Sequence, residues 1–186
     1  MIRRTFLALG LATASAPAPA LAQFDTMTLK PIVKAVREGD EDKVRSALLK
    51  GENANQIDSN GQPLLMVAVI AGQIGIAQTL LKGGAFPDTT DKEGNTSLIR
   101  AAEKGDGEMV ELLLNSKARP DLQTRQGATA LSIAARRGYA EVVQALLAKK
   151  ADPNKADFTG RTPLAYARES RKPAIEAMLR KAGARE

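Results

Sequence analysis

The 186-residue sequence contains no cysteine, no histidine and no tryptophan, and aromatic residues make up only 3% of it. Without cysteine and histidine, the chain can form no disulfide, no Cys–His zinc site and no nucleophile activated by histidine. Hydrophobic residues still make up 44% of the chain, so a core is possible, but it must be aliphatic. These absences point to a binding protein rather than to an enzyme.

The first 22 residues are typical of an export signal. Arg3 and Arg4 form a positive start, a short apolar stretch follows, and residues 20–22 are Ala-Leu-Ala, a pattern that signal peptidases cleave. The apolar stretch is too short to span a bilayer as a stable helix. We therefore expect cleavage after Ala22 and a periplasmic or secreted protein. Residues 3–7 are similar to a twin-arginine signal, which leaves the twin-arginine and Sec routes both open.

A 33-residue period runs through the rest of the chain. One glycine series follows short Ala-rich segments, and a second series lies 11 residues before it in each period. The first series is Gly39, Gly72, Gly105 and Gly138, and the second is Gly61, Gly94, Gly127 and Gly160. Such a fixed period indicates an array of similar structural units.

Each period has the residues for a turn followed by two short helices. Thr96, Thr129 and Thr162 precede the first helix, where a threonine side chain can cap free backbone N–H groups. The second helix has apolar residues at helical spacing, as in residues 109–114. Neither helix is long enough to be stable alone in water, so each period must bury its apolar side against its neighbours.

This pattern resembles the ankyrin repeat, whose consensus is D-x-x-G-x-T-P-L-H-x-A-A-x-x-G-x-x-x-x-V-x-x-L-L-x-x-G-A-x-x-N. Thr162-Pro163-Leu164 matches its T-P-L motif, whereas the histidine after that motif is absent throughout. The resemblance implies an all-α ankyrin-repeat solenoid of five 33-residue helix-turn-helix repeats joined by β-hairpin-like loops. The expected segments are a signal peptide at 1–22, an N-terminal capping repeat at 23–60, repeats at 61–93, 94–126 and 127–159, and a C-terminal capping repeat at 160–186.

The C-terminal capping repeat departs from the pattern between its two helices. Residues 171–173 are Arg-Lys-Pro, where the other repeats have a glycine and no proline. We therefore expect a different turn at this place.

The resemblance also implies that partners bind to the hairpin tips and inner helices, which line a concave face. The variable positions of the fourth repeat are strongly basic, and both arginine and aromatic residues are frequent in interface hot spots. The candidate partner-binding residues are Arg125, Arg136, Arg137 and Lys149, with Lys104, Arg161 and Phe158 beside them. Two alternatives stay open: the charges keep the protein soluble, and Phe158 folds back on the neighbouring hairpin.

We expect a monomeric, non-enzymatic module that binds the acidic surface of a protein partner. The alternative is a basic envelope-associated protein that binds anionic polymers or lipid headgroups. The isoelectric point of 9.7 would suit nucleic acid, but export would not, so we expect no nucleic-acid partner. We also expect no cofactor and no metal, because there is no phosphate-binding glycine loop and the acidic residues at 38–42 lack calcium-loop spacing. No further apolar run is long enough to span a membrane.

Overall fold

The computed structural model describes residues 30–185, so the expected signal peptide and the start of the first repeat lie outside the described residues. Within that range the chain forms ten helices and, apart from two isolated β-bridges, no strand. The helices form five pairs: α1 (Pro31–Glu38) with α2 (Glu41–Leu49), α3 (Leu64–Ile70) with α4 (Ile74–Lys82), α5 (Ser97–Lys104) with α6 (Gly107–Asn115), α7 (Ala130–Arg137) with α8 (Ala140–Ala148), and α9 (Pro163–Glu169) with α10 (Pro173–Lys181). The prediction of an all-α repeat solenoid is confirmed.

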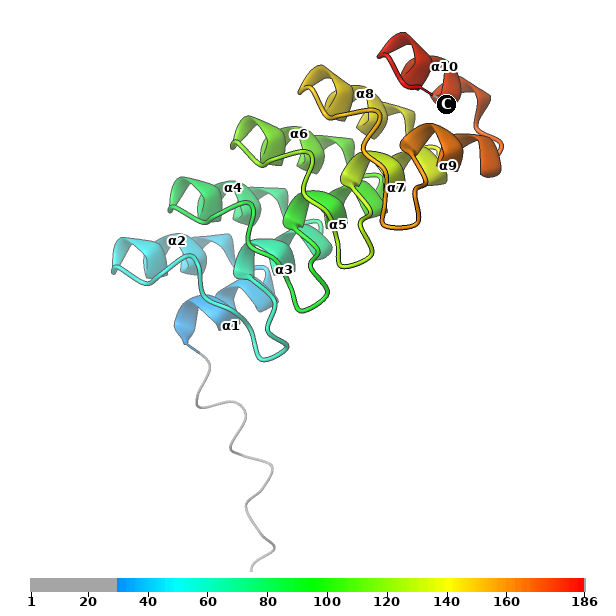
Figure 1. Cartoon of the computed structure of the whole chain (residues 1–186). Helices are drawn as coiled ribbons and strands as arrows, with labels where there is room; N and C mark the ends of the chain where they lie inside the picture. The colour runs from blue at the N-terminus through cyan, green and yellow to red at the C-terminus, as the bar shows by residue number, and fades with distance from the viewer. Residues whose placement is uncertain (1–29, 186) are drawn as a thin grey trace, which may run out of the picture.

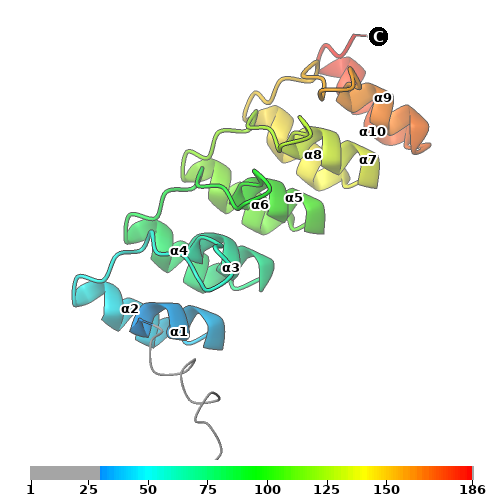
Figure 2. The same cartoon turned by 60° about the horizontal axis from the view of Figure 1, so that its bottom comes forward.

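The helix pairs stack in one direction, from α1–α2 to α9–α10 (Figures 1 and 2). Each odd-numbered helix packs against the next odd-numbered helix, as α5 does against α7 and α7 against α9. Loops with the shape of hairpins connect the pairs and project beside this row (Figure 1). We call the odd-numbered helices the inner helices, and we call the surface that they form with the hairpins the inner face.

The core follows the 33-residue period. Leu80, Leu113, Leu146 and Leu179 occupy equivalent positions in four outer helices, and each is completely buried. Alanines fill the inner helices at buried positions, as in Ala101 and Ala134, and let neighbouring helices approach closely. The helix pairs therefore depend on their neighbours to exclude water from their apolar sides.

The predicted threonine caps are present at the inner helices. The Thr96 hydroxyl accepts a hydrogen bond from the Ile99 amide at 3.3 Å, and Thr162 does the same for Ala165 at 3.2 Å. Thr129 and Ser132 form a reciprocal pair, in which each side-chain oxygen accepts from the other residue's backbone amide. These bonds fix where each inner helix begins, and therefore where its hairpin ends.

The turn in the last helix pair differs from our expectation. Arg171 lies where four other repeats have glycine, and its φ of +54° is in the same left-handed region. The Lys172 amide donates to the Ala167 carbonyl at 2.9 Å, just as the Asp40 amide donates to Ala35 at 3.0 Å. The predicted different turn is therefore wrong: packing of α9 against α10 imposes the common turn on a residue that does not favour it.

Candidate partner-binding face

Each hairpin is closed by one side chain at its base. Asp58, Asp91 and Asp157 each accept hydrogen bonds from the backbone amides two and four residues later, and the Thr124 hydroxyl does the same. Adjacent hairpins are also joined, because the Arg125 amide donates to the Glu93 carbonyl at 3.2 Å. The Phe158 amide likewise donates to the Gln126 carbonyl at 3.3 Å, so backbone hydrogen bonds join the last three hairpins along the edge of the inner face.

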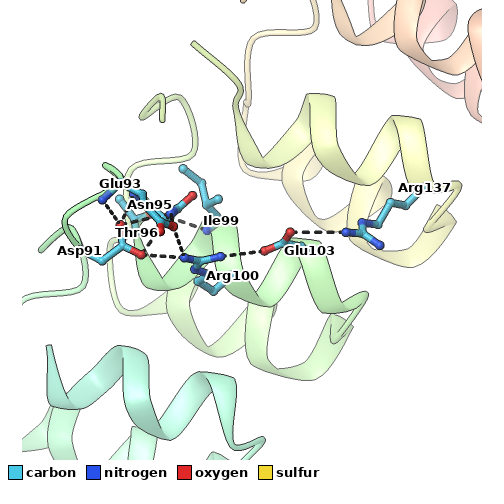
Figure 3. Close-up of polar contacts among 8 residues, drawn as sticks. All are labelled: Asp91, Glu93, Asn95, Thr96, Ile99, Arg100, Glu103 and Arg137. Carbon is cyan, nitrogen blue, oxygen red and sulfur yellow. Dashed lines mark hydrogen bonds and ion pairs between the residues drawn. The ribbon is translucent and has the colours of Figure 1, made fainter. Parts of the chain in front are cut away.

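Arg100 of α5 organises a polar network at the third repeat (Figure 3). Its guanidinium contacts Asp91 and Glu93 at 2.8 Å and Glu103 at 3.1 Å. Glu103 also accepts from Arg137 of α7 at 3.3 Å, which links the third repeat to the fourth (Figure 3). The positive charges of this region are therefore matched by carboxylates.

The hydrogen bonds around Asp91 set its ionisation. Burial alone would raise the pKa of this carboxyl, but donors from Arg100 and Asn95 outweigh burial and hold the pKa below its ordinary value. The Asp91 side chain is only 6% exposed, so it is a buried carboxylate that depends on its donors.

Tyr166 of α9 occupies the position equivalent to Arg100 and makes the equivalent contact. Its hydroxyl donates to Asp157 at 2.5 Å. The guanidinium carbons of Arg161 and Arg136 lie 4.8 and 5.6 Å from the centroid of its ring, within the range of cation–π attraction. Tyr166 thus connects the last hairpin, which carries Arg161, to the end of α7, which carries Arg136.

The Tyr166–Asp157 pair is held in one protonation state at neutral pH. Burial raises the pKa of the Tyr166 hydroxyl, and its hydrogen bond to Asp157 raises the pKa further. Burial would also raise the pKa of Asp157, but the donors from Thr159 and Tyr166 outweigh it and hold the pKa well below its ordinary value. The phenol is therefore the donor and the carboxylate the acceptor.

The structure brings several predicted residues to the inner face. Arg125, Arg136, Arg137, Lys104 and Arg161 are all exposed there. They differ in their contacts, because Arg137 binds Glu103 whereas the Lys104 ammonium donates to the Ile70 carbonyl at 2.6 Å. Arg161 lies between Asp157 at 3.7 Å and Glu169 at 3.6 Å.

Phe158 is exposed to solvent and also lies against the neighbouring hairpin. Its side chain is 72% exposed, yet its amide donates to the Gln126 carbonyl of the preceding hairpin at 3.3 Å. Its ring also lies close over Gly127, since a Cβ at that glycine would come within 2.8 Å of a ring carbon. The aromatic ring is thus held against the hairpin with one side open.

Lys149 lies apart from the two arginines at the end of α7. It follows the last residue of α8, an outer helix of nine residues that begins just after the α7–α8 turn. At 1.5 Å per residue, about 13 Å of helix separates Lys149 from that turn and from Arg137. The structure therefore places Lys149 at the end of an outer helix, away from Arg136 and Arg137.

Tyr166, Arg100 and their carboxylate partners were not among the predicted site residues. The sequence carries a signal for them, but only when equivalent positions are compared along the period. Val67, Arg100, Ile133 and Tyr166 share one position, and Asp58, Asp91, Thr124 and Asp157 share the position nine residues earlier. Arg100 and Tyr166 each contact the aspartate of their repeat, and Ile133 is paired with Thr124, whereas Val67 is paired with Asp58, which accepts hydrogen bonds from backbone amides.

Two other properties of the described residues bear on function. Over residues 30–185 no group of three or more acidic side chains is arranged to hold a metal ion. In the same range no helix has the length and apolar character needed to cross a bilayer.

Comparison with known families agrees with the repeat architecture. A family model of ankyrin repeats, comprising three copies, matches residues 32–124 and again residues 101–185. A search of curated proteins gave no match. Ankyrin repeats mediate protein–protein interactions, and proteins built from them are typically not enzymes. Because the two matches together extend over almost all of the described residues, the chain belongs to the ankyrin-repeat family.

Proposed function

We propose that this protein is an exported, non-enzymatic module that binds an acidic surface of a partner protein through its inner face. The observation that carries the proposal is the charge of the fourth repeat. From residue 122 to residue 140 the chain contains Arg125, Arg136 and Arg137 and no acidic residue. Among the described residues, Arg125 and Arg136 make no ion pair.

The nearest carboxylates of the third repeat have basic partners of their own. The carboxylates of the third repeat already surround Arg100, and Glu103 additionally binds Arg137. Arg125 and Arg136 therefore present guanidinium groups without a carboxylate partner on the inner face, among the described residues. Charges at the edge of an interface mainly accelerate encounter with an oppositely charged partner.

The binding site can be tested by charge reversal. A pull-down with the exported protein would identify the partner, and association rates would then be measured at low and at moderate salt. We expect Arg136→Glu with Arg137→Glu to slow association several-fold at low salt and much less at moderate salt. Unchanged association at low salt would place the binding site elsewhere.

A matched control separates the site from the net charge. Lys149 and Lys150 are also adjacent, exposed and basic, but they follow the outer helix α8. Lys149→Glu with Lys150→Glu changes the net charge by the same amount, and we expect a much smaller effect on association. Equal effects of the two double variants would mean that only total charge matters.

The export part of the proposal is supported by residues 1–22 and needs its own test. The pattern predicts that the mature chain begins at Gln23. Mass spectrometry of the protein from the exported fraction measures this directly. An intact Met1 in a soluble exported fraction would contradict cleavage.

A further inference from the structure

Arg136 and Arg137 are consecutive residues at the end of α7, but their surroundings differ. Arg137 donates to Glu103 of the preceding repeat at 3.3 Å, so it takes part in the Arg100 network. Arg136 has no carboxylate partner among residues 30–185 and lies over the ring of Tyr166, in the following repeat. One arginine is already occupied, whereas the other has its hydrogen-bond donors available.

The ring of Tyr166 is a fixed support for Arg136. Tyr166 is only 6% exposed, and its hydroxyl is anchored to the buried Asp157. A guanidinium over such a ring is attracted to its face while its N–H donors at the edge remain free. Holding the guanidinium in place before binding reduces the entropy that an arginine side chain loses when it engages a carboxylate.

The position of Arg136 in the period also sets it apart. The equivalent residues in the two flanking repeats are Glu103 and Glu169, and further along the array they are Ile70 and Arg37, so Arg136 is a cation between two repeats that have a carboxylate at its position. Glu103 is bound by two arginines, and Glu169 lies 3.6 Å from Arg161. Both flanking carboxylates therefore have cations of their own, which limits their competition for Arg136.

Resting on the proposed function, we infer that Arg136 is the residue that binds an acidic side chain of the partner protein. Tyr166 acts as a positioning residue that holds its guanidinium, and Arg161 adds a second cation on the same ring. Arg137 instead joins the third and fourth repeats and takes no direct part in recognition. The guanidinium fork of Arg136 suits the two oxygens of an aspartate or glutamate side chain.

The test uses the full chain labelled with ¹⁵N and hexaglutamate as the acidic probe, at low salt. NMR signals of the arginine Nε–H groups report each side chain separately, and the single variants Arg136→Gln and Arg137→Gln assign them. We expect the Arg136 signal to shift saturably with hexaglutamate, while the Arg137 signal stays in place. Arg136→Gln should weaken binding at least fivefold, and Arg137→Gln less than twofold.

Substitutions at Tyr166 test the positioning role. Tyr166→Phe keeps the ring but removes its hydrogen bond to Asp157, so it should weaken hexaglutamate binding less than Tyr166→Leu does. Tyr166→Leu removes the ring and should weaken binding several-fold, and the amide spectrum of each variant shows whether the fold is retained. If Tyr166→Leu unfolds the chain, the contrast between Arg136→Gln and Arg137→Gln still decides the matter.

The outcomes distinguish the inference from the proposed function. Equal weakening by Arg136→Gln and Arg137→Gln would overturn the inference while leaving an acid-binding inner face. No shift of any arginine signal in the wild type would overturn both. Binding to vesicles of phosphatidylglycerol without binding to hexaglutamate would also overturn both, in favour of a lipid surface.

Discussion

Replacing Arg100 by isoleucine should destabilise the protein by leaving Asp91 buried without its cation. Removing one partner of a buried ion pair costs about 3–5 kcal/mol. Asp91 keeps its donors from Asn95 and Glu93, and the Arg100 side chain is 23% exposed, so we expect a smaller loss of about 1–3 kcal/mol. Urea unfolding at pH 7, followed by far-UV circular dichroism, measures this loss.

The fourth repeat supplies the compensating change. There Thr124 and Ile133 occupy the positions of Asp91 and Arg100, and Ile133 is buried. The double variant Asp91→Thr with Arg100→Ile copies this pair, and we expect its free energy of unfolding to lie within about 1 kcal/mol of the wild type, because apolar replacements of buried ion pairs are often neutral. Equal losses in Arg100→Ile and in the double variant would refute the unpaired carboxylate as the cause.

An exposed ion pair provides the control for Arg100. Arg119 contacts Asp88 at the same distance of 2.8 Å, but its side chain is 69% exposed. Exposed pairs are worth about 0.2–1 kcal/mol, so Arg119→Ala should cost less than Arg100→Ile. A comparable loss in the two variants would mean that burial does not set the strength of the Arg100 network.

The loss caused by Arg100→Ile should also depend on pH. The pKa of Asp91 is lower in the folded protein than its unfolded value of about 3.8, so its contribution to stability is present above that pH and is lost as the pH falls through the folded pKa. Without Arg100 the pKa of Asp91 should rise towards its ordinary value. The difference in free energy of unfolding between wild type and variant should therefore be larger at pH 7 than at about pH 3.

Two backbone predictions follow from matched positions. Lys117 has a φ of +68°, and the equivalent residue 33 positions earlier is Gly84. Lys117→Gly should therefore stabilise the protein by about 0.5–1 kcal/mol. Gly84→Ala should destabilise it through its positive φ alone, because the added Cβ would meet no atom within 4 Å. Gly127 and Gly160 both have a φ of +83°, but a Cβ at Gly127 would lie 2.5 Å from the Phe158 amide nitrogen, while one at Gly160 would meet nothing within 4 Å. Gly127→Ala should therefore cost about 1–3 kcal/mol more than Gly160→Ala in urea unfolding, and equal costs would contradict the close contact between hairpins.

The core and the helix ends were predictable because they repeat. A buried leucine such as Leu113 has a leucine 33 residues away on either side, and threonine caps such as Thr129 recur with the same period. Repetition makes a structural role visible in a single sequence, since residues with the same environment face the same physical demand. The turn at Arg171 could not be predicted for the complementary reason: arginine has no local preference for a positive φ, and the packing of α9 against α10 holds it in the turn that glycine makes elsewhere.

The polar contacts of the inner face could not be predicted in the same way. Each depends on two or three side chains whose identities change from repeat to repeat, as the pairs Arg100–Asp91 and Tyr166–Asp157 show. The basic residues are visible in the sequence, but Arg136 cannot be distinguished from Arg137 there, because the two arginines are consecutive and have the same local sequence around them. Their difference arises from Glu103 and Tyr166, which lie 34 residues before Arg137 and 30 residues after Arg136.

This separation of roles explains how such a solenoid can change its binding without changing its fold. The position shared by Val67, Arg100, Ile133 and Tyr166 tolerates an apolar, a cationic and an aromatic residue, while the inner-helix backbone keeps the same course (Figure 1). The contacts at the hairpin base differ with this residue: Arg100 pairs with three carboxylates, whereas Tyr166 donates to one carboxylate and lies under the guanidinium of Arg136. We therefore expect a substitution at this one position to change which neighbouring side chains are free to contact a partner, while the buried leucines of the outer helices keep their packing.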